Sequence, residues 1–301
     1  MHQGETYTAK EYAAKVEWSA RQIVRLDADI IGFQEIWHRD SLVDVFGQAG
    51  LADQYELITC DKAGMAVGLA VRCPMQIQHT AWIWHFPPNL VLRKRPPFEP
   101  GQPDYCLQMD IDRFSRPVLH VEVRPYAGHD IAVYVGHLKS KLGIRLDVDE
   151  LDSIKAEAAV IGRAMAGLRR TAEAAALRIM INDRMRASAI PVVLMGDFND
   201  EPRSDAMEIL SGTAPYQLHS VAELPRVSGG LQQPVYTHLH DGQPLALDYI
   251  FVSEHFSPVS AMRQWMFDGV RIYSDHLAGN NTASSDHGLL RANFHYQPLI
   301  R

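Results

Sequence analysis

The sequence predicts an α/β (α+β) fold in which two β-sheets pack face to face and helices cover them from outside. Short runs rich in β-branched residues recur along the chain, which is typical of strands, and a few helical patterns separate them. We find no internal repeat, low-complexity tract or linker, so we expect a single domain over residues 1–301. A doubly wound parallel sheet is the alternative, because strand and helix alternate in the first half, but no glycine-rich dinucleotide motif supports it.

The composition is that of an ordinary globular protein, with 47% hydrophobic and 22% charged residues. The longest apolar runs fall far short of the roughly 18 residues that cross a bilayer. Residues 1–10 also lack the apolar core of a secretory signal, so we expect no transmembrane segment and, by default, a cytoplasmic protein. The net charge of −7 argues against a surface that binds nucleic acid by charge alone, although a bound cation would offset a site rich in carboxylates.

The cysteines Cys60, Cys73 and Cys106 are odd in number and lack the spacing of a metal-binding knuckle. A disulfide framework is therefore not expected. We predict that these residues are buried, reduced thiols.

The first half of the chain predicts a helix over residues 9–26 and a strand over 30–36. Apolar residues recur in the helix at the spacing that places them on one face, namely Tyr12, Val16, Ala20 and Ile23. The strand is apolar and ends in Gln34 and Glu35. Further strands are predicted at residues 55–60, 66–72, 118–124, 131–138, 191–198, 247–252 and 288–295.

Two longer segments lie between these strands. Residues 150–187 contain no proline, which predicts either one long helix or two consecutive helices. Residues 81–116 are rich in Pro, Trp and Phe and carry the basic cluster that includes Arg93. We expect this segment to be a long ordered loop, and such loops are often functional.

The most informative strand end carries Asp197 and Asn199, directly after the buried-strand pattern of residues 191–195. With a period of two, these side chains point to the same side while Phe198 points to the other. A carboxylate beside an amide can orient a water molecule and hold a phosphoryl oxygen. Taken alone, a turn that closes the strand explains the motif nearly as well.

Other strand ends carry complementary groups. His137 and Lys139 share one face at the end of a second strand and offer donors to an anionic oxygen. Asp248 lies within an apolar strand, where an ionised carboxylate needs a partner, and His287 in a later loop is the candidate. His238 and His240 could bind a metal, but exposure on a strand or loop is the expectation. Surface positions explain each motif singly, but not all of them together.

The order and wording of these motifs resemble the endonuclease/exonuclease/phosphatase superfamily, which includes deoxyribonuclease-I-like nucleases, abasic-site endonucleases, inositol polyphosphate phosphatases and neutral sphingomyelinases. The motifs that carry the resemblance are Gln34-Glu35, His137-Leu138-Lys139-Ser140, Gly196-Asp197-Phe198-Asn199, Leu247-Asp248-Tyr249 and Ser285-Asp286-His287. The resemblance implies a four-layered α/β/β/α sandwich of two mostly antiparallel sheets, with the site at one edge.

The resemblance also implies a role for each residue. Glu35 corresponds to the principal metal-binding carboxylate and Asp286 to a second one, and oxygen ligands suit Mg²⁺ or Mn²⁺. Asp197 would orient or deprotonate the attacking water, and Asn199 would steady that water or a phosphate oxygen. His287, held by Asp248, would donate hydrogen bonds to the phosphate. His137 would also contact the phosphate, with Lys139 as a helper.

One element of the superfamily is missing from this sequence. These enzymes normally begin with a strand whose asparagine reaches the metal site, but no asparagine precedes Asn89 here. Either the chain is shortened at its N-terminus or the protein lacks this strand. Loss of an interior strand leaves backbone groups unpaired, so we expect strand donation from another chain, for example in a homodimer, or a weakened fold and metal site.

The leading functional hypothesis is a phosphodiesterase that cleaves nucleic acid, because His-Leu-Lys-Ser followed by Lys141 resembles bacterial nuclease-like members. A phosphatase or phosphodiesterase of a small molecule or lipid headgroup is the alternative. Arg93 and Arg116 are candidate phosphate contacts in either case. A non-catalytic binding protein on this fold is a third hypothesis, which the presence of Glu35, Asp197 and His287 disfavours.

Overall fold

The computed structural model describes residues 7–60, 64–88, 90, 111–145, 157–225, 236–279 and 281–299. Its central element is a six-stranded sheet that is antiparallel except where β6 and β7 run parallel. The strands of this sheet are, in spatial order, β4 (Gln76–His85), β5 (Arg113–Arg124), β6 (Ile131–His137), β7 (Val192–Asp197), β11 (Asp248–Ser253) and β8 (Leu218–Ser220). A single parallel pair excludes the doubly wound alternative.

Two smaller sheets pack against one face of the six-stranded sheet. The first has the order β1 (Ile30–Ile36), β3 (Ala66–Arg72), β2 (Tyr55–Thr59), and the second pairs β12 (Trp265–Tyr273) with β13 (Leu289–Tyr296). Buried valines and leucines of β3, β5 and β6 meet in one apolar cluster between the layers. Because burial of apolar surface is the main driving force for folding, this cluster joins the sheets into one core.

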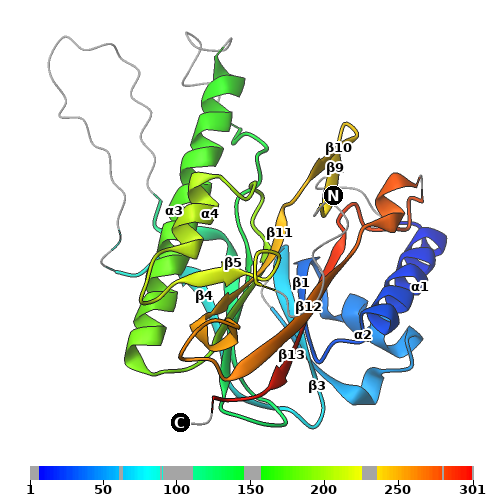
Figure 1. Ribbon diagram of the computed structural model, residues 1–301. Helices are drawn as coiled ribbons and strands as arrows, with labels where there is room; N and C mark the ends of the chain where they lie inside the picture. The colour runs from blue at the N-terminus through cyan, green and yellow to red at the C-terminus, as the bar shows by residue number, and fades with distance from the viewer. Residues whose placement is uncertain are drawn as a thin grey trace, which may run out of the picture.

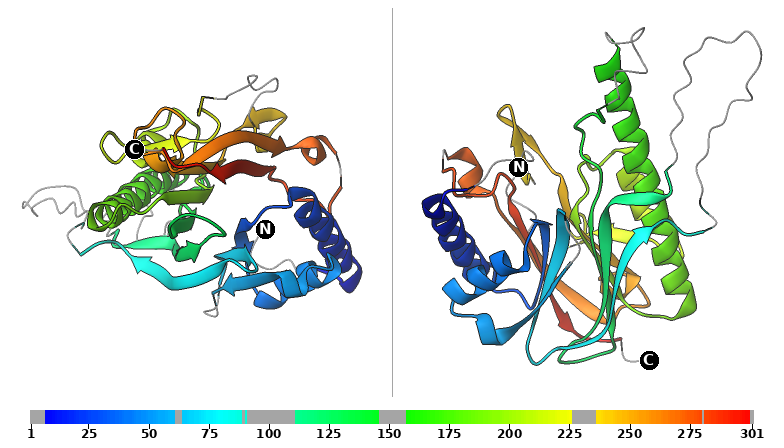
Figure 2. Two further views of the ribbon diagram at one scale, coloured as in Figure 1. Left: turned by 60° about the horizontal axis from the view of Figure 1, so that its bottom comes forward. Right: turned by 180° about the vertical axis from the view of Figure 1, so that it is seen from behind.

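Helices form the two outer layers. α1 (Ala9–Leu26) and α2 (Arg39–Gln48) cover the three-stranded sheet, while α3 (Ala158–Ala187) and α4 (Asp205–Ser211) cover the far face of the six-stranded sheet (Figures 1 and 2). The hairpin of β9 (His238–His240) and β10 (Gln243–Leu245) projects from one end, and short 3-10 helices span Ala52–Gln54, Glu254–Phe256 and Asp275–Ala278. The predicted four-layered α/β/β/α sandwich is confirmed.

Local signals explain where α1 begins and ends. Thr8 and Glu11 form a capping box, in which the Thr8 hydroxyl accepts from the Glu11 N–H and the Glu11 carboxylate accepts from the Thr8 N–H at 2.8 Å. The helix ends at Asp27, whose φ of 40° lies in the left-handed region. Its apolar face buries Ala20, Ile23 and Leu26 against β1 and α2, as the helical spacing predicts.

The strands predicted from residues 55, 66, 131, 191, 247 and 288 onwards are all present with ends shifted by a residue or so. Residues 158–187 form one continuous helix, so the alternative of two consecutive helices is wrong. The loop predicted over 81–116 is wrong at both ends, because β4 continues to His85 and β5 begins at Arg113. Trp82 and Ile83 pack into the two opposite core clusters, as a pleated strand requires. Residues 91–110 lie outside the described part of the chain.

The prediction of buried thiols is wrong for the two cysteines that the structure describes. Cys60 is half-buried and Cys73 is exposed, and both are free thiols. Cys106 lies outside the described residues. No helix within the described ranges is both long and apolar enough to cross a membrane.

A groove of about 710 Å³ separates β1 from β13. Among the described strands, β1 pairs only with β3, and β13 pairs only with β12. Both strands line the groove together with Val133, Val193 and Met195 of the six-stranded sheet. Within the described residues, the facing edges of β1 and β13 therefore have no strand between them. Strand donation from another chain stays a prediction.

Candidate active site

Three of the predicted site residues share one row across the six-stranded sheet. His137 ends β6, Asp197 ends β7, and Asp248 begins β11. The strand register places His137 opposite Asp197, and Asp197 opposite Asp248. Side chains at paired positions of neighbouring strands lie on the same face of a sheet. The register therefore brings these three residues together, although they are far apart in the sequence.

Two glycines allow the strands to approach closely at this point. Gly196 precedes Asp197 and has a φ of 150°, and a Cβ atom there would lie 1.9 Å from the carbonyl oxygen of Gly136. No side chain fits into that distance, and L residues rarely adopt this backbone conformation. Glycine at position 196 is therefore required to place His137 beside Asp197.

Asn199 is fixed to Asp197 by two hydrogen bonds. Its backbone N–H donates to Asp197 Oδ1 at 2.8 Å, and its Nδ2 donates to Asp197 Oδ2 at 3.0 Å. β7 ends at Asp197, and Asn199 has a left-handed φ of 55°, which asparagine tolerates better than most residues. The predicted proximity of the two side chains is present, but a turn brings it about and strand alternation does not. Phe198 points into the core and is fully buried.

The second partner of Asp197 is His137, whose Nε2 lies 3.3 Å from Oδ2. Burial alone raises the pKa of the Asp197 carboxyl, but the hydrogen bond from His137 and the charges of His137 and His287 outweigh it and lower the pKa. Asp197 is therefore ionised at neutral pH. The His137 Nδ1 atom is buried and has no hydrogen-bond partner within the described residues.

Asp248 holds His287, as the sequence predicts. The Asp248 Oδ2 and His287 Nδ1 atoms are 2.8 Å apart. Burial lowers the pKa of His287, but the hydrogen bond and charge of Asp248 act more strongly and raise it to about 9. The hydroxyl of Thr237 accepts from the Asp248 N–H at 3.1 Å and fixes the start of β11. An imidazolium with Nδ1 bound to a carboxylate has its Nε2–H left to donate.

Two further histidines contact His287. The ring of His238 packs on the ring of His287 with centroids 4.8 Å apart, and its Nδ1 lies 2.9 Å from the backbone oxygen of Asp286. The Nε2 of His276 lies 2.9 Å from the backbone oxygen of His287. The sequence placed His238 and His240 on an exposed strand or loop, which holds for His240 only. A short polar hairpin gives no pattern that reveals the position of His238.

The two predicted metal carboxylates lie opposite this row. Glu35, on β1, and Asp286, in the loop before β13, line a cavity of about 930 Å³ together with Asp197, Asp248 and His287. Glu35 has a left-handed φ of 58°, where the register of β1 with β3 shifts between Phe33 and Ile36. Backbone conformations of this kind cluster at active sites and ligand-binding segments.

Lys15 of α1 also lines this cavity. Its Nζ donates to the backbone oxygen of Ser284 at 3.0 Å. Burial lowers the pKa of Lys15, while the charges of Asp286 and Glu35 act in the opposite direction. Lys15 is thus a partly buried cation that lines the same cavity as the two predicted metal ligands.

The donor set fits a divalent cation. Ligand atoms of Asp197, Asp248 and His287 lie within 4.8 Å of one another, and so do those of His238, Asp286 and His287. Glu35 belongs to neither cluster in the described chain. Four carboxylates around one cavity carry more negative charge than Lys15 and His287 offset, and carboxylate oxygens are the ligands that Mg²⁺ and Mn²⁺ prefer.

The predicted basic contacts take different positions. Lys139 Nζ donates to the backbone oxygen of Leu142 at 2.7 Å, and Arg116 Nη1 donates to that of Leu138 at 3.1 Å. Neither residue lines the cavity. The charges of Asp197 and Glu35 nevertheless act on Arg116, whose Nε is buried and has no hydrogen-bond partner within the described residues. Arg93 lies outside the described residues.

The four-layered sandwich and the row of Asp and His residues at its strand ends define the class of endonuclease/exonuclease/phosphatase folds. The sequence model of the Endonuclease/Exonuclease/phosphatase family matches residues 18–287. The chain therefore belongs to this family, whose members are generally phosphoester hydrolases. A search of curated proteins found no match.

Several solved structures share this fold. The human Nocturnin catalytic domain with bound sulfate anion has a TM-score of 0.58 at 16% identity, with 97% of this chain and 89% of that chain covered. An endonuclease/exonuclease/phosphatase from Bacteroides vulgatus has a TM-score of 0.57 at 16% identity (95% and 92% covered). A mannosyl-6-phosphatase from Bacteroides thetaiotaomicron has a TM-score of 0.55 at 14% identity (95% and 92% covered). At these identities the similarity concerns the fold.

Proposed function

We propose that the protein is a divalent-metal-dependent phosphodiesterase that cleaves by in-line attack of water, with a nucleic acid as the leading substrate class. The observation that carries the proposal is the row of His137, Asp197 and Asp248, with His287 bound to Asp248 at 2.8 Å. It supplies an ionised carboxylate and a protonated imidazole on one face. In-line hydrolysis needs both, one for the attacking water and one for the phosphoryl oxygens.

Asp197 is the group that receives the attacking water. Its carboxylate is buried and ionised, and two hydrogen bonds from Asn199 fix its plane. A carboxylate whose pKa is lowered is a weak base, so orientation of the water is favoured over removal of its proton. The Nδ2 atom of Asn199 donates to Asp197 Oδ2 and to the Leu138 carbonyl, so its Oδ1 is left to accept from the attacking water.

His287 is the donor to the phosphate. With Nδ1 bound to Asp248 and a pKa of about 9, the ring is protonated at neutral pH and donates through Nε2. Its positive charge stabilises the negative charge that develops on the phosphoryl oxygens. Glu35 and Asp286 would hold the divalent cation, which supplies charge neutralisation and orientation of the phosphate when bound.

A phosphatase or phosphodiesterase of a small molecule or lipid headgroup is the second candidate. Aromatic side chains of Tyr12, Trp18, Phe33 and Trp37 line the cavity beside the carboxylates. They favour a substrate that carries an apolar or aromatic group next to its phosphate. The net charge of −7 also favours a smaller anion over a polyanion.

Hydrolysis of bis-p-nitrophenyl phosphate in Mg²⁺, in Mn²⁺ and in EDTA tests the proposal. We expect turnover that needs the metal and that is lost in Asp197→Ala. A panel of plasmid DNA, an abasic duplex, phosphomonoesters and sphingomyelin in Mn²⁺ then separates the two candidates. Absence of metal-dependent turnover on every substrate, with Asp197→Ala indistinguishable from wild type, would favour a non-catalytic binding protein.

A further inference from the structure

Helix α3 directs two buried ionic side chains at the loops that carry the active-site residues. Glu173 is 1% exposed and Arg170 is 8% exposed. The two are three residues apart, so they lie on the same face of the helix. Burial of a charge is costly unless partners compensate for it, so the partners of these two residues indicate what the burial stabilises.

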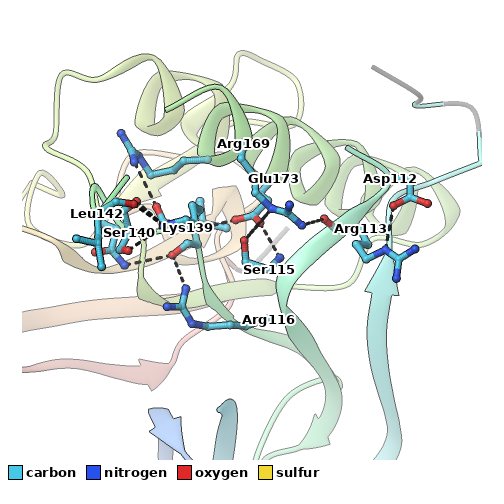
Figure 3. A network of polar contacts seen from close by, with 12 residues as sticks. Asp112, Arg113, Ser115, Arg116, Lys139, Ser140, Leu142, Arg169 and Glu173 are labelled. Atoms are coloured by element: carbon cyan, nitrogen blue, oxygen red, sulfur yellow. Dashed lines mark hydrogen bonds and ion pairs between the residues drawn. The ribbon is translucent and has the colours of Figure 1, made fainter. Parts of the chain in front are cut away.

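Glu173 joins the helix to two strands of the six-stranded sheet. Its Oε2 accepts from the backbone N–H of Lys139 at 2.7 Å, just after β6. Its Oε1 accepts from the backbone N–H of Ser115 at 2.6 Å, on β5, and from Arg169 Nε at 3.3 Å. Figure 3 shows Glu173 pointing from α3 between Ser115 and Lys139. Its carboxylate therefore fixes the backbone that follows His137.

The peptide group that Glu173 holds also binds Asn199. The N–H of Lys139 and the C=O of Leu138 belong to one peptide unit. That C=O accepts from Asn199 Nδ2 at 3.2 Å and from Arg116 Nη1 at 3.1 Å. A charged acceptor on the N–H polarises the peptide and strengthens its carbonyl as an acceptor. Glu173 is thus connected through one peptide to the carboxamide of Asn199 and the guanidinium of Arg116.

Arg170 joins Lys139, just after β6, to Asp200 in the turn after β7. Its Nη1 donates to the backbone oxygen of Lys139 at 3.2 Å, and its Nε donates to Asp200 Oδ2 at 2.8 Å. Asp200 directly follows Asn199, whose left-handed backbone persists only where its surroundings hold it. The hydroxyl of Tyr249 donates to the Asp200 backbone oxygen at 2.8 Å and supports the same residue.

We infer that Glu173 and Arg170 are positioning residues for the reaction, acting from α3 without touching the substrate. Glu173 sets the orientation of the Asn199 carboxamide through the Leu138–Lys139 peptide, and Arg170 fixes the turn that carries Asn199. The inference rests on the proposed function, in which Asn199 contacts the attacking water.

The variant Glu173→Gln keeps the size of the side chain but removes its charge, and its amide group faces one of the donors. We expect kcat in saturating Mn²⁺ to fall by roughly tenfold to a hundredfold, the usual cost of small misplacements of active groups. The matched control is Glu122→Gln. Glu122, on β5, accepts from Arg184 of α3 at 2.8 Å, so it also joins α3 to β5. This control should retain kcat within about twofold of wild type.

A double-mutant cycle with Asn199→Ala tests the route of the effect. If Glu173 acts through Asn199, Glu173→Gln lowers kcat by less than about twofold once Asn199 is already alanine. The inference is overturned if Glu173→Gln matches Glu122→Gln, or if it lowers kcat by the same factor in both backgrounds. Inactivity of the wild type would instead contradict the proposed function.

An NMR measurement tests the inference independently of activity. In wild type the Lys139 amide proton, bound to a carboxylate, should resonate far downfield, and in Glu173→Gln it should move upfield together with the Asn199 side-chain amide signals. Unchanged Asn199 signals would overturn the inference. If Glu173→Gln does not fold, Arg170→Lys tests the same turn, because lysine keeps the charge but lacks the planar guanidinium that binds the Lys139 carbonyl and the Asp200 carboxylate. We expect a lower kcat and shifted Asn199 side-chain amide signals, with the Lys139 amide proton still downfield because Glu173 is retained.

Discussion

The two sides of the active-site cavity differ in how they are held. His137, Asp197 and Asp248 lie on β6, β7 and β11, each of which has a hydrogen-bonded neighbour on both sides. Glu35 lies on β1, and Asp286 lies in the loop before β13. Among the described strands, β1 and β13 are each paired on one edge only. The sheet register thus fixes Asp197, the proposed acceptor for the attacking water, together with its neighbours His137 and Asp248. The two proposed metal ligands lie on or next to strands beside an open groove.

This contrast has a physical consequence. Strands paired on both sides and buried in the core open only when the whole domain unfolds, whereas strands at an open edge open locally at lower free energy. We therefore expect His137, Asp197 and Asp248 to be the rigid part of the site. Metal affinity should be the part that depends on how the groove between β1 and β13 is filled.

The largest expected effect is at Asp197. Asp197→Ala removes the acceptor for the attacking water, so kcat should fall by roughly 10²- to 10⁴-fold, the range for loss of a positioned acid or base. Added Mn²⁺ should not restore it, because the lost group belongs to the rigid side. Steady-state kinetics measure this, with far-ultraviolet circular dichroism as the control for folding. Recovery of activity at high Mn²⁺ would instead indicate that Asp197 is a metal ligand.

Glu35→Gln should show the opposite behaviour. Loss of one carboxylate weakens metal binding, so the Mn²⁺ concentration for half-maximal activity should rise by roughly tenfold to a hundredfold. Activity should return in part when Mn²⁺ is raised, unlike that of Asp197→Ala. A Mn²⁺ titration of the rate measures this. A fall in kcat with an unchanged Mn²⁺ requirement would contradict the assignment of Glu35 as a metal ligand.

The Asp248–His287 pair predicts a pH dependence in the metal-free protein. Because the pKa of His287 is raised to about 9, the stabilisation by its partner is complete below about pH 6.5 as long as Asp248 is ionised, and it is lost as pH rises through about 9. Burial raises the pKa of Asp248, so the low-pH limit is set by protonation of that carboxylate. In EDTA, NMR should show His287 titrating near 9 and, in Asp248→Asn, near its ordinary value. The stability difference between the two proteins should shrink over the same pH range. An unchanged His287 titration in Asp248→Asn would contradict the assigned pair.

Hydrogen exchange measures the smallest expected difference, which is in backbone protection. Amides of β6 and β7 should exchange only on global unfolding, and those of β1 and β13 should exchange at least about tenfold faster in a monomer. Light scattering supplies the mass. A dimer in which β1 and β13 become protected would indicate strand donation by a second copy. Equal protection of all four strands in a monomer would contradict the contrast between the two sides.

The fold and the row of His137, Asp197 and Asp248 can be predicted from the sequence, for a physical reason. Asp197 and Asp248 interrupt strongly apolar strand runs, and a polar residue there needs a partner or a function. β4 and β12 are missed because their mixed polar and apolar residues resemble those of loops. Lys15, His238, Arg170 and Glu173 are missed for another reason. They lie on helices or a short hairpin, and only tertiary packing brings them to the site, so no local pattern marks them.

The most direct test of the central claim is a Mn²⁺ titration of bis-p-nitrophenyl phosphate hydrolysis by wild type, Glu35→Gln and Asp197→Ala under identical conditions. We predict saturable, EDTA-reversible activity in wild type, the same activity displaced to higher Mn²⁺ in Glu35→Gln, and no recovery at any Mn²⁺ concentration in Asp197→Ala. Activity of wild type that is independent of metal, or equal in Asp197→Ala, would contradict the assignment of the site.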